Sequence, residues 1–312
     1  MTRFYKVLCV LILATTAAAP LHAQIDPLYA QYLNNPLVIN PAYTGLNKEL
    51  NVSVSFRKQW AGFDGSPTTF NATAHTSLFD NRMGAGIILV SDQIGEYTNT
   101  LAMATYSYKI QMDRTFISFG LQAGVANYRG DNSELKILDE GDAYFAEDIN
   151  TTKPVFGAGV ILTNDNLFVG LSVPRMLKTK GTYTNPATDE TVEGDVYTQH
   201  FYGMASYILF LNDRLRLKPA VLLKYVQSNP LSVDVNAVLN IDERYGIGAF
   251  TRNFSTYGFL AQARFGPSFR FAYAFELPTG KSVGVNFTTH EITLGLNLAV
   301  FSFHDIARVN SF

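Results

Sequence analysis

The chain has 312 residues and a formal net charge of −2, and only 16% of its residues are charged, against roughly 25% in an ordinary soluble domain. Aromatic residues make up 13%, which excludes a disordered chain. The mean hydropathy of +0.05 excludes a bundle of membrane helices, each of which needs about 20 apolar residues. The near-neutral charge gives no electrostatic basis for nucleic-acid binding. A chain that is apolar in places but lacks membrane helices favours a membrane β-barrel.

The first residues have the layout of a secretory signal peptide. Two basic residues precede an apolar run over residues 7–19, and Leu21-His22-Ala23 offers a cleavage site. We therefore expect residues 1–23 to be removed during export to the outer membrane of the cell. The alternative, a retained membrane helix, is disfavoured because the run is short for a hydrocarbon core of about 30 Å. The only cysteine, Cys9, lies in this segment, so the mature chain would fold without disulfides.

Residues 24–48 are expected to form an irregular segment that fits neither strand nor helix. Three prolines interrupt regular structure there, and each follows an Asp or Asn residue, an order that favours turns. These pairs are Asp26-Pro27, Asn35-Pro36 and Asn40-Pro41. Three tyrosines offer large amphipathic contacts of the kind that recognition surfaces favour. They are Tyr29, Tyr32 and Tyr43.

Residues 49–300 consist of short segments in which apolar and polar residues alternate. In the first segment Val52, Val54 and Phe56 are separated by Ser residues, and residues 215–225 and 231–239 repeat the pattern. A period of two residues predicts strands with one apolar and one polar face. We count 14 such segments and find no comparable period of 3.6 residues. The sequence therefore predicts an all-β fold, a 14-stranded antiparallel transmembrane β-barrel, followed by a tail over residues 301–312.

The connections alternate in length, which supports a barrel in a membrane. Every second connection is a tight turn rich in Asn, Asp and Gly, residues that tolerate turn conformations. These turns are 80–82, 112–114, 164–166, 212–214, 242–244 and 266–267. Outer-membrane barrels have short periplasmic turns and long external loops, and an even number of strands returns both termini to the periplasm. A soluble barrel of lipocalin type is disfavoured because it closes with fewer strands.

The bilayer also constrains the faces of the strands. Open sheet edges are not stable in hydrocarbon, so the strands must close on themselves, with apolar residues outward and polar residues inward. Aromatic side chains near the strand ends are expected to form the girdles at the two membrane interfaces. They are Trp60, Tyr97, Tyr128, Phe210, Tyr225, Tyr245, Tyr257 and Phe265.

Searches for reactive or ligand-binding motifs give no site. Gly84-Ala85-Gly86 and Gly157-Ala158-Gly159 lack the third glycine and the helix of a dinucleotide loop, so we interpret them as small residues where lumen contents crowd the wall. The four histidines of the mature chain share no spacing typical of metal ligands. His75 and Ser77 lack a positioned third member for hydrolysis. The acidic loop over residues 130–150 does not have the spacing of a calcium loop. We expect no cofactor, no metal and no enzyme activity.

The N-terminal segment also carries a specific resemblance. Residues 25–46 and, after them, 57–63 and 65–69 resemble the start of the PorP/SprF family of type IX secretion system membrane proteins, with later similarity at 170–174 and 290–292. The segment positions that match are Asp26, Pro27, Tyr29, Gln31, Tyr32, Asn35, Pro36, Asn40, Pro41, Ala42, Tyr43 and Gly45. The positions that match in the next motif are Gln59, Trp60, Gly62, Phe63, Pro67 and Thr68. The tail over residues 301–312 departs from the family by running past the expected end of the last strand.

The resemblance implies an outer-membrane component of the machinery that exports or retains surface proteins. In gliding relatives such proteins are linked to the delivery of motility adhesins. The implied partners are periplasmic and outer-membrane secretion components and a cognate secreted surface protein, besides the lipid of the outer membrane.

Two classes of function follow from these observations. The first is a secretion-linked barrel that acts through protein partners, and the second is a passive porin or solute channel. The N-terminal segment distinguishes them, because a diffusion porin has no need of it. An even-stranded barrel places this segment on the periplasmic side or folded into the lumen, where it would act as a docking peptide, as a plug, or as both.

Overall fold

The computed structural model describes residues 30, 32, 34–131, 148–184, 191–227, 229–279 and 287–303. The expected signal peptide over residues 1–23 lies outside these residues. So do most of the acidic loop, at 132–147, and residues 304–312 of the tail.

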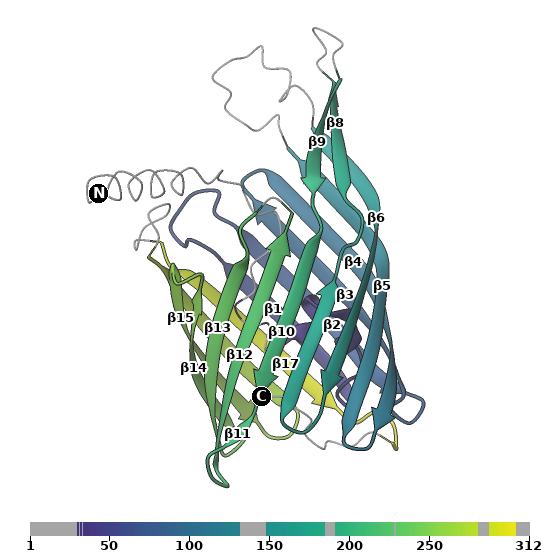
Figure 1. The fold of residues 1–312 in the computed structure, drawn as a ribbon. Coiled ribbons are helices and arrows are strands. Elements are labelled where there is room, and N and C mark those ends of the chain that lie inside the picture. The colour runs from purple at the N-terminus through teal and green to yellow at the C-terminus, as the bar shows by residue number, and fades with distance from the viewer. Residues whose placement is uncertain are drawn as a thin grey trace, which may run out of the picture.

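Within the described part of the chain, fourteen antiparallel strands close into one barrel, which confirms the predicted fold (Figure 1). Each strand pairs with the barrel strands before and after it in the chain, and the last pairs with the first. The first eight are β1 (Leu50–Lys58), β2 (Thr68–Leu78), β3 (Met83–Ile94), β4 (Tyr97–Met112), β5 (Thr115–Gly130), β6 (Ile149–Thr163), β7 (Leu167–Val173) and β10 (His200–Tyr207). After β11 (Leu209–Phe210), which continues β10 along β12, come β12 (Leu215–Val226), β13 (Ser232–Ile241), β14 (Tyr245–Arg252), β15 (Thr256–Phe265), β16 (Phe269–Pro278) and β17 (Thr289–Leu298).

A second, two-stranded sheet interrupts the connection between β7 and β10. Strands β8 (Thr179–Thr184) and β9 (Thr191–Tyr197) pair only with each other and project beyond the rim of the barrel (Figure 1). The sequence predicted only a long connection here.

The two ends of the barrel differ in their connections. One end, called the short-turn end below, carries the tight turns at 79–82, 113–114, 164–166, 211–214, 242–244 and 266–268. Asp80, Asp113 and Asp242 adopt a positive φ of 50–52° in these turns, a conformation that Asp and Asn tolerate. The opposite, long-loop end carries the connections at 59–67, 131–148, 174–199 and 279–288. It also carries tight turns at 95–96 and 253–255, so the alternation of lengths is less strict than predicted.

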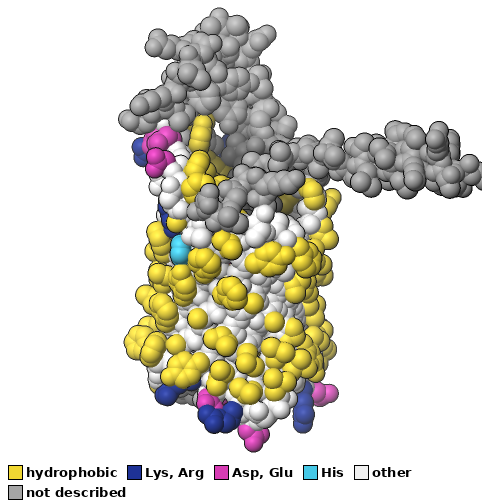
Figure 2. Space-filling view, turned by 90° about the vertical axis from the view of Figure 1, so that its left-hand side faces the viewer, with side chains coloured by type: hydrophobic (Ala, Val, Ile, Leu, Met, Phe, Trp, Pro, Cys, Tyr) yellow, Lys and Arg dark blue, Asp and Glu magenta, His cyan; other side chains and the backbone are white. Residues whose placement is uncertain are grey.

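The two faces of the wall follow the predicted alternation. On β2, Phe70 is 44% exposed on the outer face, whereas Asn71 and His75 are buried on the inner face. Hydrophobic side chains accordingly form a belt around the outside, and charged side chains gather at the short-turn rim (Figure 2).

One predicted girdle residue lies inside the barrel instead. Tyr128 is buried, because β5 places its even-numbered residues on the inner face. Its hydroxyl accepts a hydrogen bond from Arg175. Six of the remaining girdle residues are strongly exposed, namely Tyr97, Phe210, Tyr225, Tyr245, Tyr257 and Phe265, and Trp60 is half-buried.

The helices of the described residues are two single turns of 3₁₀ helix, η1 (Pro36–Val38) and η2 (Pro41–Tyr43), which precede β1. Neither is long and apolar enough to cross a lipid bilayer. At the other end of the chain, the described tail runs past β17 to Phe303, whose carbonyl accepts a hydrogen bond from Asn81 in the turn between β2 and β3.

Candidate functional site

The described residues of the N-terminal segment lie inside the barrel. The backbone N–H of Ala30 donates to Glu291 Oε2 at 2.8 Å, near the long-loop end of β17. Arg270, at the short-turn end of β16, donates to the carbonyl of Asn34 at 2.9 Å. The segment then folds against the wall and enters β1 at the short-turn end, where Leu50 pairs with Leu298. The start of β1 thus lies beside the end of β17 as an even strand number requires, but the preceding chain lines the lumen.

The two helical turns correct the expectation that the segment forms no helix. Proline fits the first position of a helical turn, because the N–H that it lacks would have no partner there. Asn40 caps η2, since its Oδ1 accepts a hydrogen bond from the N–H of Ala42 at 3.0 Å. The Asn-Pro pairs therefore start short helices as well as interrupting longer ones.

Side chains of the inner wall hold the backbone of the segment. Four of them donate hydrogen bonds to segment carbonyls that have no sheet partner, and so satisfy buried acceptors. The pairs are Ser172 to Ile39 at 2.5 Å, Ser118 to Ala42 at 2.7 Å, Ser107 to Thr44 at 2.5 Å and Lys109 to Gly45 at 2.5 Å. Because the donors lie on β4, β5 and β7, the segment is fixed to one side of the lumen.

Two asparagines of the segment donate hydrogen bonds to the wall. The amide of Asn40 donates to the carbonyls of Val160 at 3.3 Å and Leu171 at 3.2 Å, on the paired strands β6 and β7. Asn35 donates to the hydroxyl of Thr73 on β2 at 3.1 Å. Asn40 therefore satisfies backbone groups of the wall, whereas Asn35 binds a side chain.

Glycines let the segment approach the wall closely. A Cβ atom on Gly120 would lie 2.1 Å from the nitrogen of Ala42, and one on Gly84 would lie 2.2 Å from the carbonyl oxygen of Thr44. A Cβ on Gly159 would lie 2.1 Å from Asn40 Oδ1. These contacts confirm that the short Gly-Ala-Gly runs mark places where lumen contents crowd the wall.

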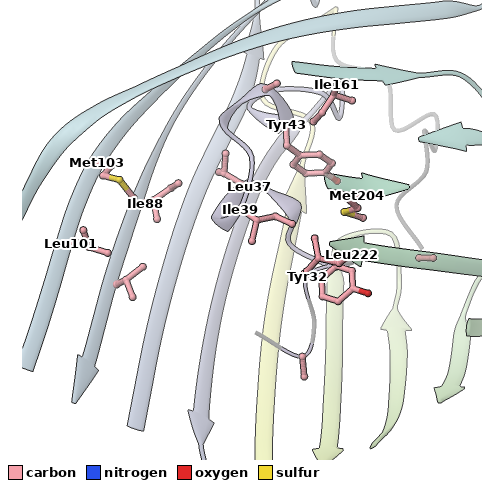
Figure 3. Close-up of a cluster of buried hydrophobic side chains, with 14 of the residues drawn as sticks. Tyr32, Leu37, Ile39, Tyr43, Ile88, Leu101, Met103, Ile161, Met204 and Leu222 are labelled. Carbon is pink, nitrogen blue, oxygen red and sulfur yellow. The ribbon is translucent and has the colours of Figure 1, made fainter. Parts of the chain in front are cut away.

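Apolar side chains fill the space around the segment. Leu37 and Ile39 are buried among wall residues of several strands, and Tyr32 and Tyr43 point into the same cluster (Figure 3). The ring of Tyr43 meets the edge of His75 at a centroid distance of 5.6 Å. His75 Nδ1 accepts a hydrogen bond from the N–H of Gly45 at 3.0 Å. His75 thus positions the segment.

The connection between β7 and β10 also folds inward, from the long-loop end. The carbonyl of Pro174 accepts a hydrogen bond from Gln122 at 2.6 Å. The guanidinium of Arg175 lies 3.6 Å from the ring centroid of Tyr197, a cation–π contact. Burial lowers the pKa of Arg175 and raises the pKa of Tyr197 above its usual value, so the tyrosine stays neutral. The lumen therefore holds two parts of the chain, the N-terminal segment and the connection between β7 and β10.

A network of buried charges crosses the inner wall in the long-loop half. Arg57 on β1 binds Glu276 on β16 at 2.8 Å and Glu291 on β17 at 3.1 Å. Arg252 on β14 binds Asp234 on β13 at 2.8 Å and lies 3.7 Å from Glu276. Cations and anions alternate along this network, as buried charges require, and its last carboxylate accepts the N–H of the N-terminal segment.

The predicted site residues thus fall into two separate groups. From Tyr32 to Gly45 they meet inside the lumen, whereas Asp26, Pro27, Tyr29 and Gln31 lie outside the described residues. The second motif forms the loop between β1 and β2 at the long-loop end. There the N–H of Gln59 donates to the carbonyl of Pro67, Gly62 has a φ of 93°, and Phe63 is 54% exposed. Trp60 also lies in this loop, and Thr68 begins β2.

Several residues that hold the segment were not predicted, among them Arg57 as an ion-pair partner and the wall donors Ser107, Lys109, Ser118 and Ser172. Their sequence signal is only a polar residue at an inward position of a strand. Ser77, next to His75 in the alternation, donates to Asn81 at 2.6 Å in a turn. Among the described residues, no group of three or more His, Cys, Asp or Glu side chains is arranged to hold a metal ion.

These features define a β-barrel of the outer-membrane class whose lumen holds its own N-terminal segment. The chain belongs to the family described as type IX secretion system membrane protein PorP/SprF, which matches residues 21–296. This match confirms the resemblance seen in the sequence. Fold and family together support a location in the outer membrane and association with a secretion system. No curated protein sequence matches the chain significantly.

Solved outer-membrane barrels share the fold. The chain is similar to the CymD monoaromatic hydrocarbon channel, with a TM-score of 0.50 and 10% identity, covering 89% of this chain and 94% of that one. It is also similar to Omp33 of Acinetobacter baumannii, with a TM-score of 0.47, 10% identity and coverages of 82% and 100%. For the toluene transporter TodX of P. putida the TM-score is 0.46, the identity 11% and the coverages 84% and 92%. At 10% identity, the likeness to CymD shows the fold alone.

Proposed function

We propose that this protein assists the export or surface attachment of a cognate secreted protein, such as a gliding adhesin, after residues 1–23 have been removed. The observation that carries the proposal is the family match over residues 21–296. The protein acts through periplasmic and outer-membrane secretion components and through its secreted cargo, not through a reaction or a cofactor of its own.

The occupied lumen supports this role over that of a passive porin or solute channel. A diffusion channel needs a continuous water-filled passage, whereas here residues 34–49 are held against the wall by hydrogen bonds and close backbone contacts. Leu37, Ala42 and Thr44 are fully buried in this arrangement. A buried segment suits a plug, while docking of partners falls to the family positions that precede it, Asp26, Pro27, Tyr29 and Gln31.

Deletion of residues 25–45 tests both roles. The signal peptide and cleavage site are kept, and the deletion is compared with the full chain in cells that lack the gene. We expect a heat-modifiable barrel still present in the outer membrane, with loss of the surface proteins that the full chain restores. The measurements are surface proteomics of intact cells and single-channel conductance of the purified barrel.

The outcomes separate the two functions. Loss of surface delivery supports the secretion role. Normal delivery by the truncated barrel would refute docking through this segment. A new open pore together with normal delivery would favour the solute channel, with the segment acting as its plug.

A further inference from the structure

One cation on the outer wall of the barrel binds no carboxylate of the described residues. On the barrel strands, the outward positions that are described carry two Lys or Arg side chains, Lys58 at the end of β1 and Arg129 near the end of β5. Arg129 binds Asp131 at 2.8 Å. The ammonium of Lys58 donates to two uncharged oxygens instead, the carbonyl of Ser66 at 3.0 Å and the hydroxyl of Thr68 at 2.9 Å. An ammonium has three donors, so one of them is left for a ligand.

Lys58 stands in a row of polar side chains that crosses neighbouring strands at the long-loop end. It is directly opposite His290 on β17 and Thr68 on β2. Thr68 is in turn opposite Gln93 on β3. The hydrogen bonds from Lys58 to Ser66 and Thr68 fix the ammonium within this row. The outer wall therefore presents one positioned cation among uncharged polar groups.

The next row toward the middle of the barrel is apolar. Phe56 is directly opposite Ile292 on β17 and Phe70 on β2, and all three side chains are 44–48% exposed. Ile292 is also opposite Tyr273 on β16, whose hydroxyl shares a hydrogen bond of 2.7 Å with His290 in the polar row. A cationic row directly beside an apolar row matches the head group and the chains of a lipid that lies along the wall.

The depth of Lys58 in the membrane agrees with a head group. An outward lysine is costly at the middle of the bilayer and costs little near an interface. Lys58 is the last residue of β1, and Trp60 follows in the loop at 59–67. Tryptophan is typical of the membrane interface. In barrels of this class the long loops face the outside, so Lys58 lies at the level of the head groups of the outer leaflet.

We propose that Lys58 and the polar row around it bind the phosphate group of a lipid of the outer leaflet, a phosphorylated glycolipid of the lipid A type. The ammonium donates its remaining hydrogen to a phosphate oxygen, a charge-assisted bond that is stronger than one between neutral groups. The acyl chains of the same molecule pack on Phe56, Phe70 and Ile292. The inference does not rest on the proposed secretion role, because lipid surrounds the barrel whatever its function is.

The arrangement of the two rows selects a lipid over a free phosphate ion. A free ion in water is held by several donors that converge on it, whereas here a single cation faces outward. The side chains beside it are apolar and belong to the belt that faces hydrocarbon. A lipid phosphate is kept beside Lys58 by its acyl chains as well as by its charge, so one cation is enough.

The test is native mass spectrometry of the purified full chain in detergent, titrated with lipid A and with the same lipid after removal of its phosphates. We expect lipid A to bind at least about tenfold more tightly than the dephosphorylated lipid. Lys58→Gln keeps a hydrogen-bond donor but removes the charge, and should weaken the binding of lipid A at least about tenfold. Lys58→Arg keeps the charge and should retain binding.

A second lysine at the same end of the barrel provides the matched control. Lys178 is exposed in the connection between β7 and β10, where it donates to Gln227 at 2.6 Å. Lys178→Gln removes the same charge away from the polar row and should leave the affinity unchanged. Unchanged heat-modifiable mobility shows that each variant is folded.

Each of the following results would overturn the proposal. Equal binding of the two lipids, or an unchanged affinity in Lys58→Gln, would show that the acyl chains alone hold the lipid. An equal loss with Lys178→Gln would indicate a general effect of charge. Equal binding of phosphatidylglycerol would reassign the row to any phospholipid, and complete displacement by millimolar inorganic phosphate would reassign it to a small anion. No binding of lipid A by the full chain would leave the row to a protein partner.

Discussion

The two halves of the lumen differ in the balance between their buried cations and carboxylates. In the long-loop half, Arg57 and Arg252 alternate with three carboxylates, and each charge has a partner of opposite sign. In the short-turn half, cations outnumber carboxylates, and Arg264 is placed directly opposite Arg270. A paired network is explained by the structure alone, because its desolvated charges compensate each other. In the short-turn half the carboxylate of Glu49 acts on both Arg264 and Arg270, so one anion offsets the repulsion between two cations.

The largest expected effect is on the paired side. Arg57→Ala removes the cation that binds Glu291 and leaves Glu276 with Arg252 alone, at 3.7 Å, and we expect a loss of about 3–5 kcal/mol in unfolding free energy. Urea titration of the barrel in lipid vesicles measures it. Arg57→Met combined with Glu276→Met should cost less than the sum of the two single changes, because contacting charges are not additive. Additive losses would mean that the network is not coupled.

An arginine introduced on the outer wall shows what a charge costs when no side chain of opposite sign is near it. Leu121 is 61% exposed in the middle of β5, so Leu121→Arg should cost about 2–4 kcal/mol in the apolar belt. Met112 is also exposed but ends β4 at the short-turn rim, where the same change should cost about 0–1 kcal/mol. Folding titrations in vesicles compare the two. Equal costs would contradict the position of the belt.

The segment that lines the lumen can be loosened without touching any charge. Gly120→Ala places a Cβ against the backbone at Ala42 and should cost about 1–3 kcal/mol, as overpacking does. The readout is maleimide labelling of Leu37→Cys at a buried position, with Cys9, the one native cysteine, replaced by serine if it is retained. We expect faster labelling with Gly120→Ala and no change with Gly203→Ala, where the nearest atom is 3.5 Å away. Equal rates would place the segment elsewhere.

The smallest effect on stability is expected at the short-turn rim. Arg214 and Asp242 are exposed, and an exposed ion pair is screened by water, so Arg214→Ala should not shift the unfolding midpoint measurably. Asp213→Ala, in the same turn, serves as control. A clear loss of stability in Arg214→Ala and none in Asp213→Ala would contradict the screening of this pair.

The sequence predicted the wall better than its contents. Alternation and turn residues indicate strand number and the two faces, because both depend on neighbouring residues. Tyr128 lies near the end of its strand, which predicts a girdle position, but its place in the alternation of β5 points inward. The hairpin of β8 and β9 has no comparable apolar alternation that would separate it from a loop.

The contents of the lumen depend on contacts between distant parts of the chain. The sequence left open whether the segment docks or plugs, because the donors Ser107, Ser118 and Ser172 are ordinary polar residues until the barrel closes. Arg57 likewise stands in a family motif, but its carboxylate partners lie more than two hundred positions away. The resemblance to the family identifies the N-terminal segment as a functional element, but it does not predict the contacts of the segment inside the barrel.

The position of the segment before β1 ties it to the closure of the barrel. The seam between β1 and β17 joins the first and last strands of the barrel, so it forms only after the whole chain has been delivered to the membrane. Residues 34–49 lie inside this seam and are fixed to β4, β5 and β7 by wall side chains. Arg270 on β16 and Glu291 on β17 hold the same segment from the other side of the seam. The segment therefore connects the first half of the wall to the last two strands across the lumen.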